Sequence, residues 1–325
     1  MKILKGSADY FYYIENRGPD TIDYLMINLP FSCNYNCCKC CNHNRIIRVP
    51  GYPFLSIEAI KAYIIKCRLL GVRAVGFMGE GELLMDKNFE ELVDFVSGNG
   101  LIFYVFTNGS LLNESMINFL ATKDVSFIIN IDSLWADRYD KWVERSGALN
   151  IVLNNLKILR EVYKNKIYEF GGHLITSLAV NMVVNNENYE EIGAMNEFCG
   201  DDIMFTINRP IFFGALASNK ENYSQSFDFN DNLFRPLGTL KEANQCYYLT
   251  KGISLSAQGF IIPCPYTVEV TGLLEFGLDN IAQDRQRVLE MVNDFYEKFG
   301  HARCLIRHPR YSEFINLLRN KKNEK

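Results

Sequence analysis

Short β-like runs alternate with amphipathic helical segments along most of this 325-residue chain. The runs predict strands at 24–30, 73–77, 101–106, 126–131, 174–184 and 203–207. Apolar residues spaced three and four apart predict helices that begin at 56 and 86 or span 113–121, 149–162 and 189–198. This alternation constrains the fold most, because successive strand–helix units form parallel sheets joined by right-handed crossovers.

The number of repeats indicates an open barrel. Six strand–helix repeats are fewer than a closed eight-fold barrel needs. We therefore expect an α/β fold, an open (β/α)6 partial TIM barrel over 23–225. An N-terminal extension (1–22) should precede it, and a small α+β auxiliary domain (226–325) should follow. In parallel α/β folds the chemistry collects at the carboxyl ends of the strands, so functional residues should follow strands directly.

Three cysteines follow the first predicted strand in the pattern C-x-x-x-C-x-x-C, namely Cys33, Cys37 and Cys40. Three thiolates this close in sequence can converge on one soft metal centre, and they are one ligand short of a closed four-coordinate site. An iron–sulfur cubane held in this way keeps one iron open to another ligand. The alternative is structural zinc, because Cys38 and Cys41 form another C-x-x-C pair and His43 follows.

Glycine and polar residues also stand at the ends of the later predicted strands. Gly81, Glu82 and Asn108 follow the second and third strands, Asn130 and Asp132 close the fourth, and Asn181 lies inside the fifth. A glycine-rich turn that carries a carboxylate can place its backbone and Glu82 against a cationic amino group. On its own such a turn is more often a tight connection between a strand and a helix.

In combination these motifs resemble the radical SAM enzymes over about residues 23–210. That family carries the same cysteine pattern after its first strand and a Gly-Gly-Glu turn after its second. Gly81 and Glu82 match the end of that turn, whereas Glu80 replaces its first glycine.

A second departure lies inside the cysteine loop. Lys39 stands where the family usually has an aromatic residue packed against the adenine. The adenine contact must then come from elsewhere, and Tyr35 is our candidate.

The resemblance implies that Cys33, Cys37 and Cys40 bind a 4Fe-4S cluster whose open iron chelates S-adenosylmethionine. It implies contacts from Glu82 to the methionine amino group and from Asn130 to the ribose or carboxylate edge. Arg145 is a weaker candidate for the carboxylate. One electron would cleave the cofactor into methionine and a 5′-deoxyadenosyl radical, which abstracts a substrate hydrogen.

The C-terminal region carries a second group of cysteines. Cys246 and Cys264 flank a predicted hairpin of strands 253–255 and 260–262, with the spacing C-x12-G-x4-C, and Cys304 follows. This pattern resembles the SPASM and twitch domains, which hold an auxiliary iron–sulfur cluster. Arg307 stands where the fourth thiolate would be expected. The alternatives are ordinary buried thiols or a thiol that donates hydrogen.

Composition restricts the partners and the location. A net charge of −4 argues against general nucleic-acid binding, and no apolar run approaches the length of a membrane span. The N-terminus lacks the apolar core of a signal peptide, and ten cysteines without an export signal favour reduced thiols or metal ligands in the cytoplasm over disulfides.

We therefore predict a metal-binding oxidoreductase of the radical SAM type. Its substrate would be a peptide or a small natural-product or sugar-like molecule, changed by oxidation, epimerisation or cross-linking. A flavodoxin or ferredoxin would donate electrons. The alternative function is a non-catalytic α/β binding protein with a structural zinc on the Cys33 loop.

Overall fold

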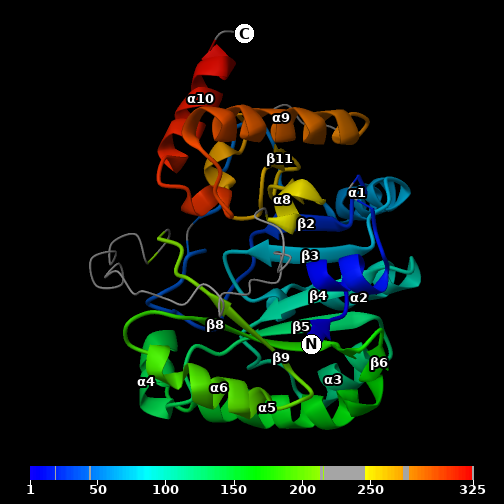
Figure 1. The fold of residues 1–325 in the computed structure, drawn as a ribbon, viewed down its shortest axis with the longest axis vertical. Helices are drawn as coiled ribbons and strands as arrows, with labels where there is room; N and C mark the ends of the chain where they lie inside the picture. Colours follow the sequence, from blue (N-terminus) through cyan, green and yellow to red (C-terminus); the bar gives the residue numbers. More distant parts are fainter. Residues whose placement is uncertain (19, 44, 213–214, 216–245, 274–277, 324–325) are drawn as a thin grey trace. The chain divides into compact units, whose positions relative to one another are not determined.

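The computed structural model describes residues 1–18, 20–43, 45–212, 215, 246–273 and 278–323 (Figure 1). The chain forms two compact units. The first comprises Met1–Asn16, Phe31–Arg45 and Glu80–Leu237, and the second comprises Arg17–Pro30, Ile46–Gly79 and Gly238–Lys325. The predicted domain boundary at 225/226 lies outside the described residues.

The first unit contains four parallel strands in the order β4-β5-β8-β9. Their bounds are β4 (Ile102–Thr107), β5 (Val125–Asn130), β8 (Leu178–Val183) and β9 (Met204–Asn208). The α-helices among the described residues of this unit are α2 (Phe89–Gly98), α3 (Glu114–Ala121), α4 (Ala136–Val143), α5 (Ala148–Tyr163) and α6 (Ile192–Cys199). Figure 1 shows α4, α5 and α6 together on one side of β8 and β9.

A smaller sheet of the first unit has the order β1-β7-β6 and corrects one prediction. Its strands are β1 (Lys2–Leu4), β6 (Tyr168–Phe170) and β7 (His173–Thr176). The single strand predicted at 174–184 is therefore wrong, because β7 pairs with β1 whereas β8 pairs with β5. The hydroxyl group of Thr176 accepts from Leu178 N at 3.1 Å and donates to Asp202 O at 2.7 Å. These two bonds replace backbone hydrogen bonds of the sheet at the point where the chain passes from β7 to β8.

The second unit contains four strands in the order β11-β10-β2-β3. Their bounds are β2 (Tyr24–Leu29), β3 (Ala74–Gly79), β10 (Gly252–Leu255) and β11 (Ile261–Ile262). Its helices are α1 (Ile57–Leu69), α8 (Tyr247–Thr250), α9 (Ile281–Phe299) and α10 (Tyr311–Asn323), and α9 packs across β11 (Figure 1). The predicted hairpin is confirmed as β10 and β11, which pair antiparallel. An unpredicted feature is that β10 also pairs in parallel with β2, so the hairpin extends the barrel strands.

Local signals explain which helices were predictable. Ser56 caps α1 by accepting from Ala59 N at 3.2 Å, as its place before the helix predicted. Helix α4 was not predicted, because it is short and four of its eight residues are charged, which leaves an apolar stripe of only Tyr139, Trp142 and Val143.

The fold class is the predicted one, α/β with parallel strands in both units. Neither set of four strands closes on itself, which agrees with an open partial barrel. Among the described residues, no helix combines the length and the apolar character needed to cross a membrane.

Candidate active site

The turn that carries Gly81 and Glu82 lies against the start of the cysteine loop. Glu82 N donates to the carbonyl oxygen of Ser32 at 2.8 Å. A Cβ atom on Gly81 would lie only 2.2 Å from that same oxygen, so the approach requires glycine. The sequence-predicted turn is thereby held beside the residue that precedes Cys33.

The carboxylate of Glu82 is buried and almost enclosed by donors. Its side chain is 3% exposed and accepts from Asn108 N at 2.7 Å and from Leu84 N at 3.3 Å. Burial raises the pKa of Glu82, and these hydrogen bonds, with one from the Thr107 hydroxyl, act in the opposite direction. A carboxylate offers about four lone-pair positions, so Glu82 can still accept a hydrogen bond from a ligand.

Asn34, which follows the first cysteine, joins the loop to the turn after β4. Asn108 Nδ2 donates to Asn34 Oδ1 at 2.9 Å, and Asn34 Nδ2 donates to Ser110 Oγ at 2.8 Å. Ser110 Oγ closes the ring by donating to Asn108 Oδ1 at 2.6 Å. Arg145 Nη1 donates to Asn34 O at 3.3 Å, so three predicted residues, Glu82, Asn108 and Arg145, do gather around this loop.

The three predicted cluster ligands share one electrostatic environment. Cys33 is exposed, and Cys37 and Cys40 are half-buried. Burial raises the pKa of all three thiols, and the neighbouring Cys40 and Cys33 raise the pKa of Cys37 further. Cys37 therefore lies close enough to Cys33 and Cys40 to interact with both electrostatically.

The donor type fits an iron–sulfur cluster, which takes cysteine thiolates. Among the described residues, no three Cys, His, Asp or Glu side chains are placed to hold a single metal ion. A cubane poses a different requirement, because each of its cysteines binds a different iron atom.

Asn130 and Asp132 form a second polar group at the ends of β5, β8 and β9. Asn181 Nδ2 donates to Asn130 Oδ1 at 2.9 Å, and Asn208 Nδ2 donates to Asn181 Oδ1 at 2.5 Å. Asp132 Oδ1 accepts from Val183 N at 2.8 Å, and burial raises the pKa of Asp132 to about 6. Asp132 also acts electrostatically on Cys37, which places it near the cysteine loop.

Several residues of the site were missed from sequence alone. They are Asn34, Ser110, Trp142, Glu187 and Asn208. Asn208 could have been found, because it ends β9 as Asn130 ends β5. Trp142 and Glu187 carry no such signal, since they reach the loop only through the tertiary fold.

In the second unit, Cys246, Cys264 and Cys304 lie around Tyr296. The phenol of Tyr296 is buried, which raises its pKa, and charges on all three cysteines add to that effect. Arg307 Nη1 lies 3.5 Å from Cys304 Sγ, within hydrogen-bond reach of sulfur.

His308 is an unsuitable fourth ligand in this arrangement. Its Nδ1 accepts from Arg310 N at 3.0 Å, and its Nε2 lies 3.1 Å from Gly300 O. Both ring nitrogens are thus already engaged, so neither is available to bind a further iron atom.

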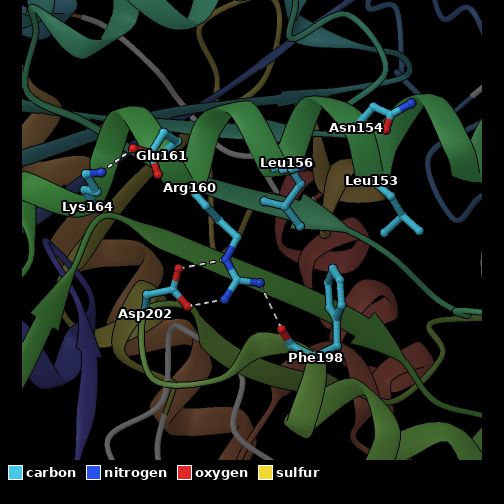
Figure 2. A pocket seen from close by; sticks show the side chains of 9 residues that line it. Leu153, Asn154, Leu156, Arg160, Glu161, Lys164, Phe198 and Asp202 are labelled. Atoms are coloured by element: carbon cyan, nitrogen blue, oxygen red, sulfur yellow. Dashed lines mark hydrogen bonds and ion pairs between the residues drawn. The ribbon is translucent and has the colours of Figure 1, made fainter.

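An open pocket of about 570 Å³ lies elsewhere in the first unit, between α5 and the segment before β9 (Figure 2). Arg160 spans it with two bonds to Asp202, at 2.8 and 2.5 Å, and a third to Phe198 O at 3.1 Å. Lys164 pairs with Glu161. These charged groups already pair with one another. Asp202 precedes β9, so the pocket lies at the amino end of that strand, whereas the candidate site lies at the carboxyl ends of the strands.

Comparison with known proteins identifies a family match. The Radical SAM superfamily model matches residues 27–199, a range that contains the cysteine loop, the Gly81–Glu82 turn, Asn108, Asn130 and Asp132. GTP 3′,8-cyclase of Sulfurovum sp. (strain NBC37-1) is 20% identical over 289 residues, which are 84% of this chain and 88% of the cyclase.

Two solved structures share the fold. Streptococcus suis SuiB bound to precursor peptide SuiA is 14% identical with a TM-score of 0.57, over 82% of this chain. Our chain spans only 64% of SuiB. Native anSMEcpe with bound AdoMet and Cp18Cys peptide is 13% identical with a TM-score of 0.56, over 93% of this chain and 99% of anSMEcpe.

Proposed function

The chain belongs to the radical SAM superfamily, and from that premise we propose that Cys33, Cys37 and Cys40 hold its 4Fe-4S cluster. We further propose that a peptide is its substrate. Membership makes the chain an enzyme with S-adenosylmethionine and an iron–sulfur cluster as cofactors, and it favours iron over the structural-zinc alternative.

One observation supports this assignment above all others. The Gly81 turn lies so close to Ser32 that no side chain fits between them, and Glu82 then reaches Asn108. The cysteine loop, the Gly-Glu turn and the turn after β4 are therefore one hydrogen-bonded assembly within a single compact unit.

When bound, the cluster and S-adenosylmethionine supply one-electron cleavage and a 5′-deoxyadenosyl radical. The protein's own residues orient the cofactor. Glu82 would accept a hydrogen bond from the methionine amino group, whose positive charge suits a buried carboxylate. Asn130, at the exposed end of β5, would contact the ribose or carboxylate edge, and Asp132 and Arg145 are further candidates.

Burial also matters for a radical reaction. Glu82 is 3% exposed and Asn181 is 9% exposed, so the interior of the first unit admits little water beside these groups. Exclusion of water and of stray hydrogen donors keeps a reactive carbon radical directed at one C–H bond.

The peptide proposal is supported by two structural neighbours that hold peptides, SuiB and anSMEcpe. The chemistry would be oxidation, epimerisation or cross-linking, with electrons from a flavodoxin or ferredoxin. A nucleotide is the second candidate substrate, because the Sulfurovum relative is a GTP 3′,8-cyclase.

We assign an auxiliary cluster to Cys246, Cys264 and Cys304, as in a SPASM or twitch extension. Their common position around Tyr296 supports this assignment. A cluster with three thiolates would leave one iron open, where a substrate could bind or deliver an electron.

Anaerobic reconstitution tests the proposal. The protein should turn brown, with absorbance at about 400 nm from iron–thiolate charge transfer. It should form 5′-deoxyadenosine from S-adenosylmethionine when reduced by dithionite. A colourless, iron-free protein would overturn the proposed function.

The substrate class needs a second measurement. A pool of synthetic peptides should raise 5′-deoxyadenosine formation and yield a product lighter by two hydrogens or enriched in solvent deuterium. Stimulation by GTP and not by peptides would establish the nucleotide alternative.

A further inference from the structure

Lys39, between Cys38 and Cys40, is a cation of the cysteine loop that is largely shielded from solvent. Its side chain is only 10% exposed, although lysine is among the residues least often buried. Its Nζ lies 2.9 Å from the centroid of the Trp142 ring and 2.9 Å from Glu187 Oε2. A desolvated ammonium needs such partners, and here an aromatic face and a carboxylate supply them.

The end of α4 holds the same loop by its backbone. Trp142 O accepts from Cys38 N at 3.0 Å, and Val143 O accepts from Asn36 N at 3.3 Å. Asn36 Nδ2 also donates to Glu144 Oε2 at 2.6 Å. Trp142 therefore contacts the loop twice, through its carbonyl group and through its ring.

The start of α4 is anchored by a buried carboxylate. Glu191 is 2% exposed and accepts from the Ser133 hydroxyl at 2.7 Å and from Leu134 N at 2.6 Å. Arg138 Nη1, from the first turns of α4, pairs with Glu191 at 2.6 Å. The helix that presents Trp142 is thus fixed at the end far from the loop.

The turn that carries Glu187 is also fixed. Glu187 N donates to Asn185 Oδ1 at 2.8 Å. Asn188 is fully buried and donates to Asp132 O at 2.6 Å. Lys39 therefore joins two supports that other bonds hold in place.

We propose that Lys39 is a positioning residue for the cluster-binding loop. Its ammonium group bridges Trp142 and Glu187 and so holds the stretch between Cys37 and Cys40 against the end of α4. This inference rests on the proposed function, because it concerns the loop assigned there to the cluster. Lys39 would thus stabilise the loop from a position where the family usually has an aromatic residue.

Trp142 itself can report the contact. The chain has two tryptophans, so the Trp135→Phe background leaves Trp142 as the single indole. Lys39 covers the ring of Trp142, so Lys39→Met should loosen the contact between the loop and α4. Acrylamide should then quench the fluorescence of Trp142 more strongly in the full-length chain. Unchanged quenching would overturn the contact.

Cluster retention tests the positioning role. In the anaerobically reconstituted protein, Lys39→Met should speed iron loss to a chelator by roughly tenfold. This factor corresponds to the free energy that a cation–π contact and a half-exposed ion pair contribute together. Glu187→Gln should speed it less, and the double variant should show less than the product of the two effects. Lys39→Arg should restore slow loss, because a guanidinium also stacks on rings and pairs with carboxylates.

Lys5→Met is the matched control. Lys5 pairs with Asp124 at 2.7 Å in the same unit, and within the described part of the chain it makes no bond to the cysteine loop. This variant should lose iron at the parental rate. If the parent holds iron and Lys39→Met loses it no faster, the positioning role is wrong while the proposed function stands. A parent that holds no iron would overturn both.

Discussion

The cysteines of the first unit come from one loop, whereas those of the second unit come from three separate places in the sequence. Cys33, Cys37 and Cys40 lie within eight positions, and backbone and side-chain bonds from Ser32, Asn34 and Lys39 hold their loop. Cys246, Cys264 and Cys304 span 59 positions and gather around Tyr296. The short spacing of the first three cysteines by itself keeps them close together. The cysteines of the second unit come together only when β10, β11 and α9 have folded.

This difference predicts that the first group is indispensable for activity. Replacement of Cys33, Cys37 or Cys40 by Ala should reduce 5′-deoxyadenosine formation to background, because each thiolate binds one iron of the proposed cluster. Chromatography of the reaction mixture measures the product. Cys38→Ala and Cys41→Ala are the controls and should retain activity. An essential Cys38 or Cys41 beside a dispensable Cys33 would show that the ligand register is shifted.

Glu82 provides the next largest effect. Glu82→Ala should weaken S-adenosylmethionine binding by roughly ten- to a hundredfold with the cluster intact, since a charge-assisted hydrogen bond contributes about 1.5–3 kcal/mol. Equilibrium dialysis of the reconstituted protein gives the affinity. Glu80→Ala, which removes the neighbouring carboxylate of the same turn, should change the affinity far less. Equal affinities for Glu82→Ala and the parent would remove Glu82 from the cofactor site.

Iron quantitation sharpens the comparison between the two cysteine groups. Two cubanes require about eight irons per chain, so the variant with Cys246, Cys264 and Cys304 all changed to Ala should lose about half of them. It should still cleave S-adenosylmethionine without substrate. Cys199→Ala is the control, because Cys199 is a fully buried core residue, and it should keep all the iron. Full iron retention in the triple variant would show that the three cysteines bind no cluster and have a structural role.

A substitution at Gly81 tests the close packing of the Gly81 turn against the cysteine loop. Gly81→Ala should destabilise the protein by about 1–3 kcal/mol, because the new Cβ would meet Ser32 O at 2.2 Å and overpack the contact. Urea denaturation measures the change in unfolding free energy. Gly98→Ala is the matched control, since nothing lies within 4 Å of a Cβ there. Equal stability of Gly81→Ala and the parent would contradict the close approach.

The smallest effect concerns the pH dependence of stability in the first unit. Burial raises the pKa of Asp132 to about 6, above its ordinary unfolded value of about 3.9. Between these two pH values the folded chain keeps a proton on Asp132 that the unfolded chain has released. The contribution of Asp132 to the free energy of unfolding is therefore present at low pH and is lost as pH rises through about 6. Asp132→Asn should flatten the stability profile of the full-length chain between about pH 4 and 6 in urea titrations. Exposed Asp201 serves as the control, and a steep profile in Asp132→Asn would contradict the assignment.

Much of the fold was predictable because it depends on local patterns. The alternation of strands and helices, the caps at Ser56 and Asn113 and the β10–β11 hairpin follow from apolar spacing and turn residues. The prediction of one strand at 174–184 was wrong, because the apolar run continues unbroken through Ser177 while the backbone changes sheet. Helix α4 was missed because four of its eight residues are charged, so that the apolar stripe of Tyr139, Trp142 and Val143 is short and interrupted in the sequence.

The sequence by itself determined the residue types and their order: three cysteines after β2, Gly81 and Glu82 after β3, and asparagines at the ends of β5 and β9. Only the tertiary structure decided which of them meet. The bonds from Glu82 to Asn108, from Asn34 to Ser110 and from Lys39 to Glu187 join residues 26, 76 and 148 positions apart. Periodicity reports which face of an element is buried, but a contact between distant loops depends on the positions of the strands that carry them.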